Sequence, residues 1–102
     1  MIHVIATIAI VPGQRKAFLA IFRELVPTVR AEEGCIEYGP AIDLTDAVAG
    51  QSSARPDTVT VIEKWADVAA LRRHLESAHM LHYRDNVKEL VTGVEIRVLE
   101  PA

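Results

Sequence analysis

The chain has 102 residues, half of them apolar and a quarter charged, which predicts one globular domain over residues 1–102. Its net charge of −3, with both signs mixed along the chain, excludes the basic surface of a nucleic-acid-binding protein. A single cysteine, Cys35, excludes an internal disulfide, and the apolar opening run is shorter than the about 20 residues that span a bilayer and lacks the cationic start of a signal peptide. We therefore expect a cytoplasmic protein with no nucleic-acid or membrane partner.

The first predicted element is a β-strand over residues 2–11, which are rich in isoleucine and valine. One face carries Ile2, Val4, Ala6, Ile8 and Ile10, and the other carries His3, Ile5, Thr7, Ala9 and Val11. Both faces are largely apolar. Helices cover only one face of a sheet in so short a chain, so the second apolar face indicates a cover from outside the monomer.

A helix is predicted after the turn at Pro12-Gly13. Its apolar residues recur at helical spacing, at Phe18, Ile21, Phe22, Leu25 and Val29. Pro27 is expected to kink or divide this helix, because proline removes a backbone hydrogen bond. Gly34 suits the left-handed position that follows a helix.

The middle of the chain is predicted to hold two strands joined by a long connection. Residues 35–44 form the first strand, and residues 58–65, rich in β-branched side chains, form the second. The polar connection over residues 45–57 exceeds the usual hairpin loop of about 2–5 residues.

The last third is predicted to form two helices and a strand. Asp67 suits the N-cap of the first helix, and Ser77 marks a break before the second. The apolar positions are Val68, Leu71 and Leu75 in the first helix and Met80, Tyr83, Val87, Leu90 and Val91 in the second. We expect Thr92-Gly93 to turn the chain into a final strand over residues 94–99.

The order β-α-β-β-α-β predicts an α+β fold of the ferredoxin-like class, a four-stranded antiparallel sheet with helices on one face. No GxGxxG or Walker pattern occurs, so a nucleotide cofactor has no support in the sequence.

Four short motifs resemble the antibiotic biosynthesis monooxygenase domain family. They are EGCIEY at 33–38, EKW at 63–65, AAL at 69–71 and HLESAH at 74–79. The resemblance implies a dimeric α+β barrel, in which the sheets of a homodimer face each other and each subunit holds a ligand pocket between its sheet and helices. Characterised members oxidise quinols or polyketide phenols with dioxygen, without metal or flavin, and relatives of the same architecture degrade haem.

The chain departs from the better-understood branches at three positions. Polyketide oxygenases carry an asparagine where this chain has Val61 and a tyrosine where it has Leu71. The haem-degrading branch carries an asparagine where this chain has Thr7. Catalytic assignments from those branches therefore do not transfer to this chain.

Glu63 is one of two candidate catalytic bases. It shares a strand face with Trp65 and Val61, the face that the resemblance directs toward the pocket. A buried carboxylate beside an indole has a raised pKa and can accept a proton. The alternative is that Trp65 belongs to the core and that Glu63 pairs with an arginine.

His79 is the other candidate base, because an imidazole can take a proton from a phenol near neutral pH. On one continuous helix, His74 and His79 would lie about 140° apart, so they converge only if the helix breaks near Ser77. The alternative for each is a hydrogen-bonded structural histidine. His82 follows His79 at a spacing that metals use, but two histidines alone are a weak site, and no metal is expected.

Two tyrosines can orient a phenolic ligand, since each is apolar with a polar tip. The side chains expected to bind substrate are Trp65, Tyr38, Thr7, His74, Tyr83 and His3. Core packing is the alternative for the tyrosines, and an ordinary sheet position is the alternative for His3 and Thr7. Cys35 is expected to be a small buried residue rather than a nucleophile.

The sequence therefore favours a cofactor-independent monooxygenase that oxidises a small aromatic or quinol-like substrate with dioxygen. A non-catalytic or regulatory small-molecule-binding dimer on the same fold is the alternative, and haem binding is a third hypothesis.

Overall fold

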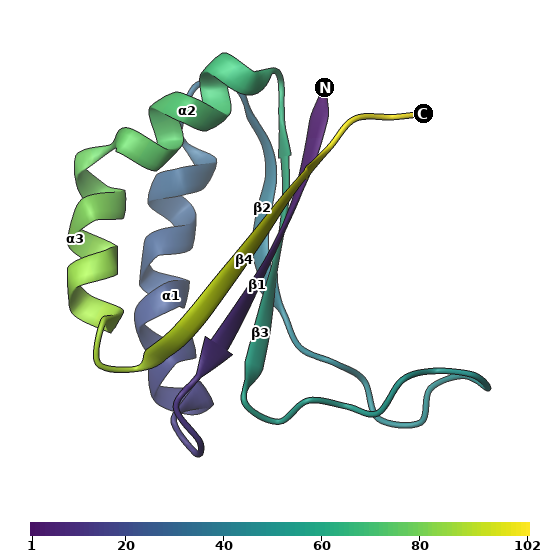
Figure 1. Ribbon diagram of the computed structural model, residues 1–102. Coiled ribbons are helices and arrows are strands. Elements are labelled where there is room, and N and C mark those ends of the chain that lie inside the picture. Colours follow the sequence, from purple (N-terminus) through teal and green to yellow (C-terminus); the bar gives the residue numbers. More distant parts are fainter.

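The computed structural model describes residues 1–102, which form four strands and three helices (Figure 1). In chain order they are β1 (Ile2–Ile10), α1 (Arg15–Arg30), β2 (Cys35–Ala41), β3 (Thr58–Trp65), α2 (Val68–Glu76), α3 (Ala78–Val87) and β4 (Val91–Leu99). None of the helices is both long and apolar enough to span a membrane.

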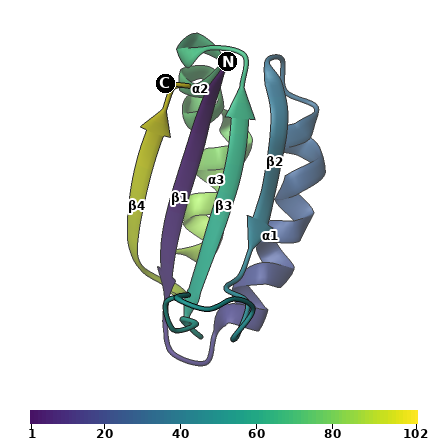
Figure 2. The same cartoon turned by 90° about the vertical axis from the view of Figure 1, so that its right-hand side faces the viewer.

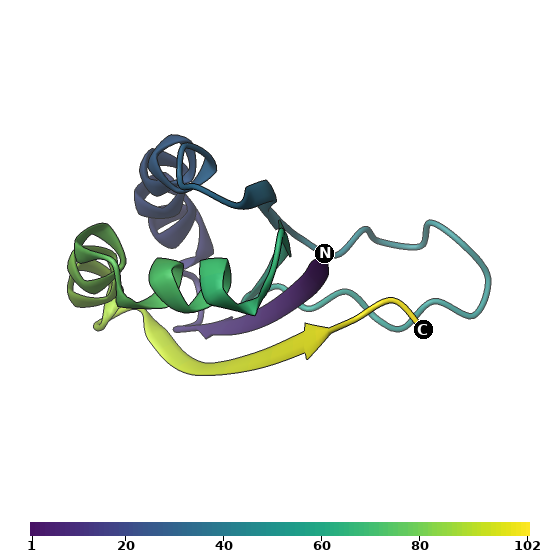
Figure 3. The same cartoon turned by 90° about the horizontal axis from the view of Figure 1, so that it is seen from above.

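The four strands form one antiparallel sheet in the order β2-β3-β1-β4 (Figure 2). All three helices lie on the same side of this sheet (Figure 3). The predicted ferredoxin-like α+β fold is therefore confirmed, with two short helices between β3 and β4.

The core lies between the sheet and the helices. Strand β1 buries alternate residues, among them Val4 and Ile8, while α1 buries its apolar stripe, including Phe18 and Phe22. Side chains repeat their direction every two residues in the strand and every 3.6 residues in the helix. Both sets of apolar side chains therefore point into one cluster.

Pro27 does not divide helix α1, which runs unbroken from Arg15 to Arg30. The proline and Arg23, four residues earlier, are both exposed, so the carbonyl that loses its helical partner faces water. The buried neighbours Val26 and Val29 hold the last turn against the core.

Three strand boundaries differ from the sequence expectation, the first by one residue only, since β1 ends at Ile10 and not at residue 11. Strand β2 ends at Ala41, three residues early, where Asp43 leaves the sheet to pair with Arg55 at 2.8 Å. Helix α3 ends at Val87, so the expectation that Leu90 and Val91 belong to it is wrong. Strand β4 begins at Val91 rather than residue 94, so Thr92-Gly93 lies in the strand and not in a turn. Gly93 pairs with Ala9 beside a register shift in β1, a place that tolerates a glycine.

The face of the sheet away from the helices has no cover within the chain. His3, Ile5 and Thr7 of β1 point to this outer face and are only partly buried, and Ile62 of β3 is exposed there. The connection over residues 42–57 and the C-terminus project on this same side of the sheet (Figure 1).

Candidate active site

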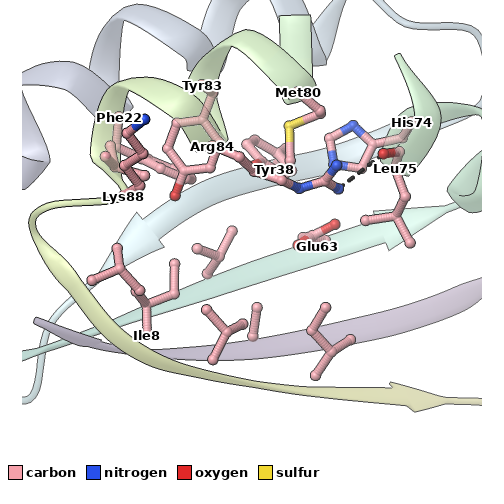
Figure 4. Close-up of a pocket in the computed structure, with 16 residues that line it drawn as sticks. Ile8, Phe22, Tyr38, Glu63, His74, Leu75, Met80, Tyr83, Arg84 and Lys88 are labelled. Carbon is pink, nitrogen blue, oxygen red and sulfur yellow. Dashed lines mark hydrogen bonds between the residues drawn. The ribbon is translucent and has the colours of Figure 1, made fainter. Parts of the chain in front are cut away.

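A cavity of about 380 Å³ lies between the inner face of the sheet and the helices (Figure 4). Twelve of its sixteen lining residues are hydrophobic, and its volume lies within the range of about 300–1,000 Å³ typical of ligand pockets. Ala6, Ile8 and Val61 form part of the sheet side, and Met80 and Val87 come from α3. An aromatic molecule with few polar groups suits such walls.

Glu63 is the one carboxylate that lines this cavity. Its position on the inner face of β3 leaves it only 6% exposed, and Figure 4 shows the side chain directed toward the helices. Burial raises its pKa to about 7, while a hydrogen bond from Trp65 lowers it and the charge of Glu32 raises it further. Near neutral pH the group is therefore present in both its protonated and its charged form.

Trp65 lies behind Glu63 rather than in the cavity wall. Its Nε1 donates to Glu63 Oε1 at 2.9 Å, and its ring lies against the His74 ring, with 4.7 Å between centroids. The indole therefore orients two cavity-lining groups and is fully buried in doing so. No arginine pairs with Glu63; its side-chain partner is this tryptophan.

The helix break at Ser77 is confirmed, and it brings His74 and His79 together. Ser77 ends α2 and caps α3, donating its hydroxyl to the His74 carbonyl and accepting from the Met80 backbone N–H. The two imidazoles then meet at Glu32, which follows the end of α1. His74 Nδ1 lies 2.7 Å and His79 Nε2 lies 3.0 Å from the same oxygen, Glu32 Oε2.

His74 joins this cluster to the cavity, because its ring is 1% exposed and lines the cavity wall. The ring makes its one hydrogen bond through Nδ1. Because Nδ1 is turned to Glu32, Nε2 on the other side of the ring is the nitrogen left for the cavity that His74 lines. Burial lowers the pKa of His74, with the Glu32 hydrogen bond acting in the opposite direction.

Glu32, His74 and His79 also have the composition of a metal site. Their ligand atoms all lie within 4.8 Å of one another, and two imidazoles with one carboxylate can bind zinc or iron. Ligands at about 2.0–2.1 Å from a tetrahedral ion are about 3.3 Å apart. The two separations from Glu32 Oε2, 2.7 and 3.0 Å, are shorter and are ordinary hydrogen-bond lengths.

The predicted tyrosines both line the cavity, from β2 for Tyr38 and from α3 for Tyr83. Phe22 stacks on Tyr38 and meets Tyr83 edge-on, which fixes the two rings. Burial raises the pKa of both phenols, so their hydroxyls stay protonated and can donate hydrogen bonds to a ligand.

Four predicted site residues lie away from the cavity: Trp65, which is buried in the core behind Glu63, and His3, Thr7 and His79. His3 and Thr7 point to the outer face of the sheet, because the cavity takes their neighbours Ala6 and Ile8 and the strand alternates. His79 lines a separate depression between α1 and α3, together with His82 and Glu24, and its side chain is 30% exposed.

Cys35 is partly buried at the start of β2, and burial raises the pKa of its thiol. The protonated form is a poor nucleophile, which agrees with the sequence expectation.

Three residues of the site are absent from the sequence prediction. Glu32 precedes the EGCIEY motif by one position, and a loop residue of this kind has no periodicity that would reveal its partners. Arg84 in α3 and Lys88 at the C-cap of α3 bring two cationic groups to the cavity lining. Arg84 Nη2 donates to the Leu75 carbonyl at 2.9 Å (Figure 4). Their helical spacing of four was a signal that they share a face.

Comparison with known proteins agrees with this fold. Residues 1–86 match the family model described as antibiotic biosynthesis monooxygenase. The probable quinol monooxygenase YgiN of Escherichia coli K12 is 45% identical over 103 residues, covering 99% of this chain and 98% of YgiN.

Two solved structures share the architecture. PA3566 of Pseudomonas aeruginosa is 33% identical, with a TM-score of 0.79 over 99% of this chain and 93% of its own. Rv0793 of Mycobacterium tuberculosis is 31% identical, with a TM-score of 0.78 over 99% and 94%. The chain therefore belongs to the antibiotic biosynthesis monooxygenase family.

Proposed function

We propose that this protein is a quinol monooxygenase that uses dioxygen to hydroxylate a hydroquinone or a polycyclic phenol. The observation that carries the proposal is Glu63, a buried carboxylate with a pKa of about 7 that lines an apolar cavity. The full-length similarity to a relative named as a quinol monooxygenase supports the substrate class. We expect the reaction to take place in the cytoplasm.

The first step is removal of a hydroxyl proton. Glu63 in its charged form accepts the proton, and burial in the apolar cavity makes the carboxylate a stronger base than one in water. The protonated hydroxyls of Tyr38 and Tyr83 can donate to the substrate oxygens and hold the ring against the sheet. Arg84 and Lys88 add positive charge where the phenolate forms.

The electrons come from the substrate, so the reaction as proposed uses no metal or flavin. The phenolate passes one electron to dioxygen, and the resulting radical pair joins at a ring carbon to form a peroxide. Glu63 returns its proton to the peroxide. The ring C–H and the O–O bond then break, a new C=O bond forms, and one oxygen atom leaves as water. A hydroquinone and one dioxygen thus give a hydroxyquinone and one water, with atoms and electrons balanced.

Oxygen uptake tests this proposal. Metal-stripped protein mixed with a panel of hydroquinones and naphthols is expected to consume dioxygen well above the spontaneous rate, with or without a chelator. Labelled dioxygen is expected to leave one labelled atom in the organic product and one in water. Saturable binding of these compounds without uptake would instead favour the binding-module hypothesis, and activity that is lost with the chelator would contradict the metal-free mechanism.

We also propose that the protein is a homodimer joined through the outer face of the sheet. Ile62 is exposed on that face, and the projecting connection carries the exposed apolar residues Ile42, Leu44 and Val48 on the same side. A sheet face with this apolar content, together with a projecting arm, suits burial against a second copy.

Charge on the outer face tests the dimer. Ile62→Arg is expected to shift the protein from dimer to monomer in analytical ultracentrifugation, because an unpaired guanidinium would be buried at the interface. Leu81→Arg, at an exposed apolar residue on the helix side, is the matched control and is expected to leave the dimer intact. A wild-type protein that sediments as a monomer at all concentrations would overturn the proposal.

A further inference from the structure

We propose that His74 is a second proton-transfer residue of the cavity, held in place for this task by Glu32 and His79. The inference rests on the proposed quinol oxidation and assigns its two proton transfers to two different bases, Glu63 and His74. Nothing in the first deprotonation by Glu63 requires an imidazole, yet the fold places one at the same end of the cavity.

The two groups are adjacent because both contact Trp65. The indole Nε1 donates to Glu63, and the indole ring lies against the His74 ring. Tyr38 also contacts this histidine, with its ring edge-on to the His74 ring at 5.4 Å between centroids. A substrate hydroxyl or peroxide that reaches Glu63 is therefore also close to His74.

The hydrogen bond to Glu32 fixes the tautomer of His74 and so determines which ring nitrogen has a free lone pair. A carboxylate oxygen accepts hydrogen bonds, so Nδ1, 2.7 Å away, carries the proton. In the neutral ring the cavity-facing Nε2 is then an acceptor. The negative charge of Glu32 also stabilises the imidazolium that forms when Nε2 takes a proton, the arrangement by which carboxylates assist catalytic histidines.

His79 holds the carboxylate from the other side. Its Nε2 lies 3.0 Å from the oxygen that His74 uses, so Glu32 Oε2 is fixed between two rings. Exposure increases along the series, from 1% for His74 through 14% for the Glu32 side chain to 30% for His79. His79 thus acts as a positioning residue at the solvent end of the cluster and has no contact with the cavity.

The step that we assign to His74 is the collapse of the peroxide. Its Nε2 takes the proton from the ring carbon that bears the peroxide, the C–H electron pair forms the new C=O bond, and the O–O bond breaks. The departing hydroxide takes the proton from His74 and leaves as water. Without this step the same peroxide can lose hydrogen peroxide by C–O cleavage, which leaves the unhydroxylated quinone.

The product ratio therefore reports on His74 and Glu32. We expect Glu32→Gln to lower the rate of hydroxyquinone formation by about 10-fold or more, since positioned proton transfer contributes about 10²–10⁴-fold to such rates. Hydrogen peroxide and plain quinone are expected to rise at the same time, and Glu32→Asp is expected to restore part of the ratio. His74→Gln should give the same change. Glu33→Gln, at the exposed neighbouring residue, is the control and should match the wild type.

The outcomes separate this inference from the proposed function. No oxygen uptake by the wild type would defeat the quinol monooxygenase proposal itself. If the wild type is active and folded Glu32→Gln has the same rate and product ratio, the proposed role of Glu32 and His74 is wrong. The quinol monooxygenase proposal would still stand. If His74→Gln fails to fold, the Glu32 pair of variants still decides the question, because that side chain lies outside the cavity lining.

Discussion

Replacing Glu63 with glutamine is expected to reduce kcat by about 10²–10⁴-fold, the usual contribution of a positioned general base. Glutamine keeps the shape and can still accept the hydrogen bond from Trp65, but it cannot take a proton. The wild-type rate is expected to rise with pH through about 7, as Glu63 loses its proton, and this ionisation should be absent from the variant.

The same substitution is expected to stabilise the folded protein at neutral and higher pH. The pKa of Glu63 is about 7 in the folded state against 4.5 for the ordinary group, so the folded state holds the proton more tightly. Proton binding at Glu63 therefore contributes its full stabilisation of the folded state below pH 4.5, and this contribution is lost as the pH rises through 7. At about 1.4 kcal/mol per pKa unit, wild type should lose about 3 kcal/mol relative to Glu63→Gln across this window.

Denaturant unfolding at pH 4.5, 6 and 8, beside the activity profile, measures both effects. Glu37→Gln, on the neighbouring strand but directed to the outer face, is the control for removing a carboxylate from the sheet. Trp65→Phe removes the hydrogen bond that lowers the pKa of Glu63, so the activity profile should move to higher pH. A Glu63→Gln variant with wild-type kcat would rule out this residue as the base.

Gly34→Ala is expected to have the largest effect on folding of any glycine substitution in the chain. Gly34 has φ +85°, and an added Cβ would lie 2.5 Å from the Cβ of Ala70 in α2. The left-handed backbone costs about 1–2 kcal/mol with a side chain, and overpacking adds about 1–3 kcal/mol. The free energy of unfolding should therefore fall by about 2–5 kcal/mol.

The two causes can be separated with matched variants. Gly13→Ala has nearly the same φ, +82°, but meets no atom within 4 Å, so it should cost only the backbone part. Ala70→Gly in the Gly34→Ala background removes the clash, and a double-mutant cycle by urea unfolding should show a favourable coupling between the two positions. Equal losses for Gly34→Ala and Gly13→Ala would show that the contact with Ala70 relaxes at no cost.

Local sequence signals predicted most of the fold because each has a nearby cause. The Asp67 cap is confirmed by its 2.8 Å bond from the Ala70 N–H, and the Gly34 position by its positive φ. Thr92-Gly93 was misassigned because a glycine at a bulge and a glycine in a turn give the same signal. Only the register with Ala9, a contact far along the chain, distinguishes them.

The site was predicted in part for the same reason. Strand alternation placed Glu63 and Trp65 on one face, but nothing local states which face of β1 the helices cover. Thr7 was therefore assigned to the pocket while its neighbours Ala6 and Ile8 line it. The role of Glu32 depends on contacts 42 and 47 residues away, with His74 and His79, and long-range contacts of this kind leave no periodic trace in the sequence.

The helix break at Ser77 limits where related chains can gain or lose residues without losing the histidine cluster. Two short helices that share one capping residue give the histidines five positions apart a geometry that no single helix allows. A residue inserted in the last turns of α3 would leave His74 and His79 where they are. An insertion between them would move the two rings apart, and they could then no longer share one carboxylate. In a related chain, the spacing H-x-x-S-x-H is therefore a better sign that both histidines contact one carboxylate than either histidine alone.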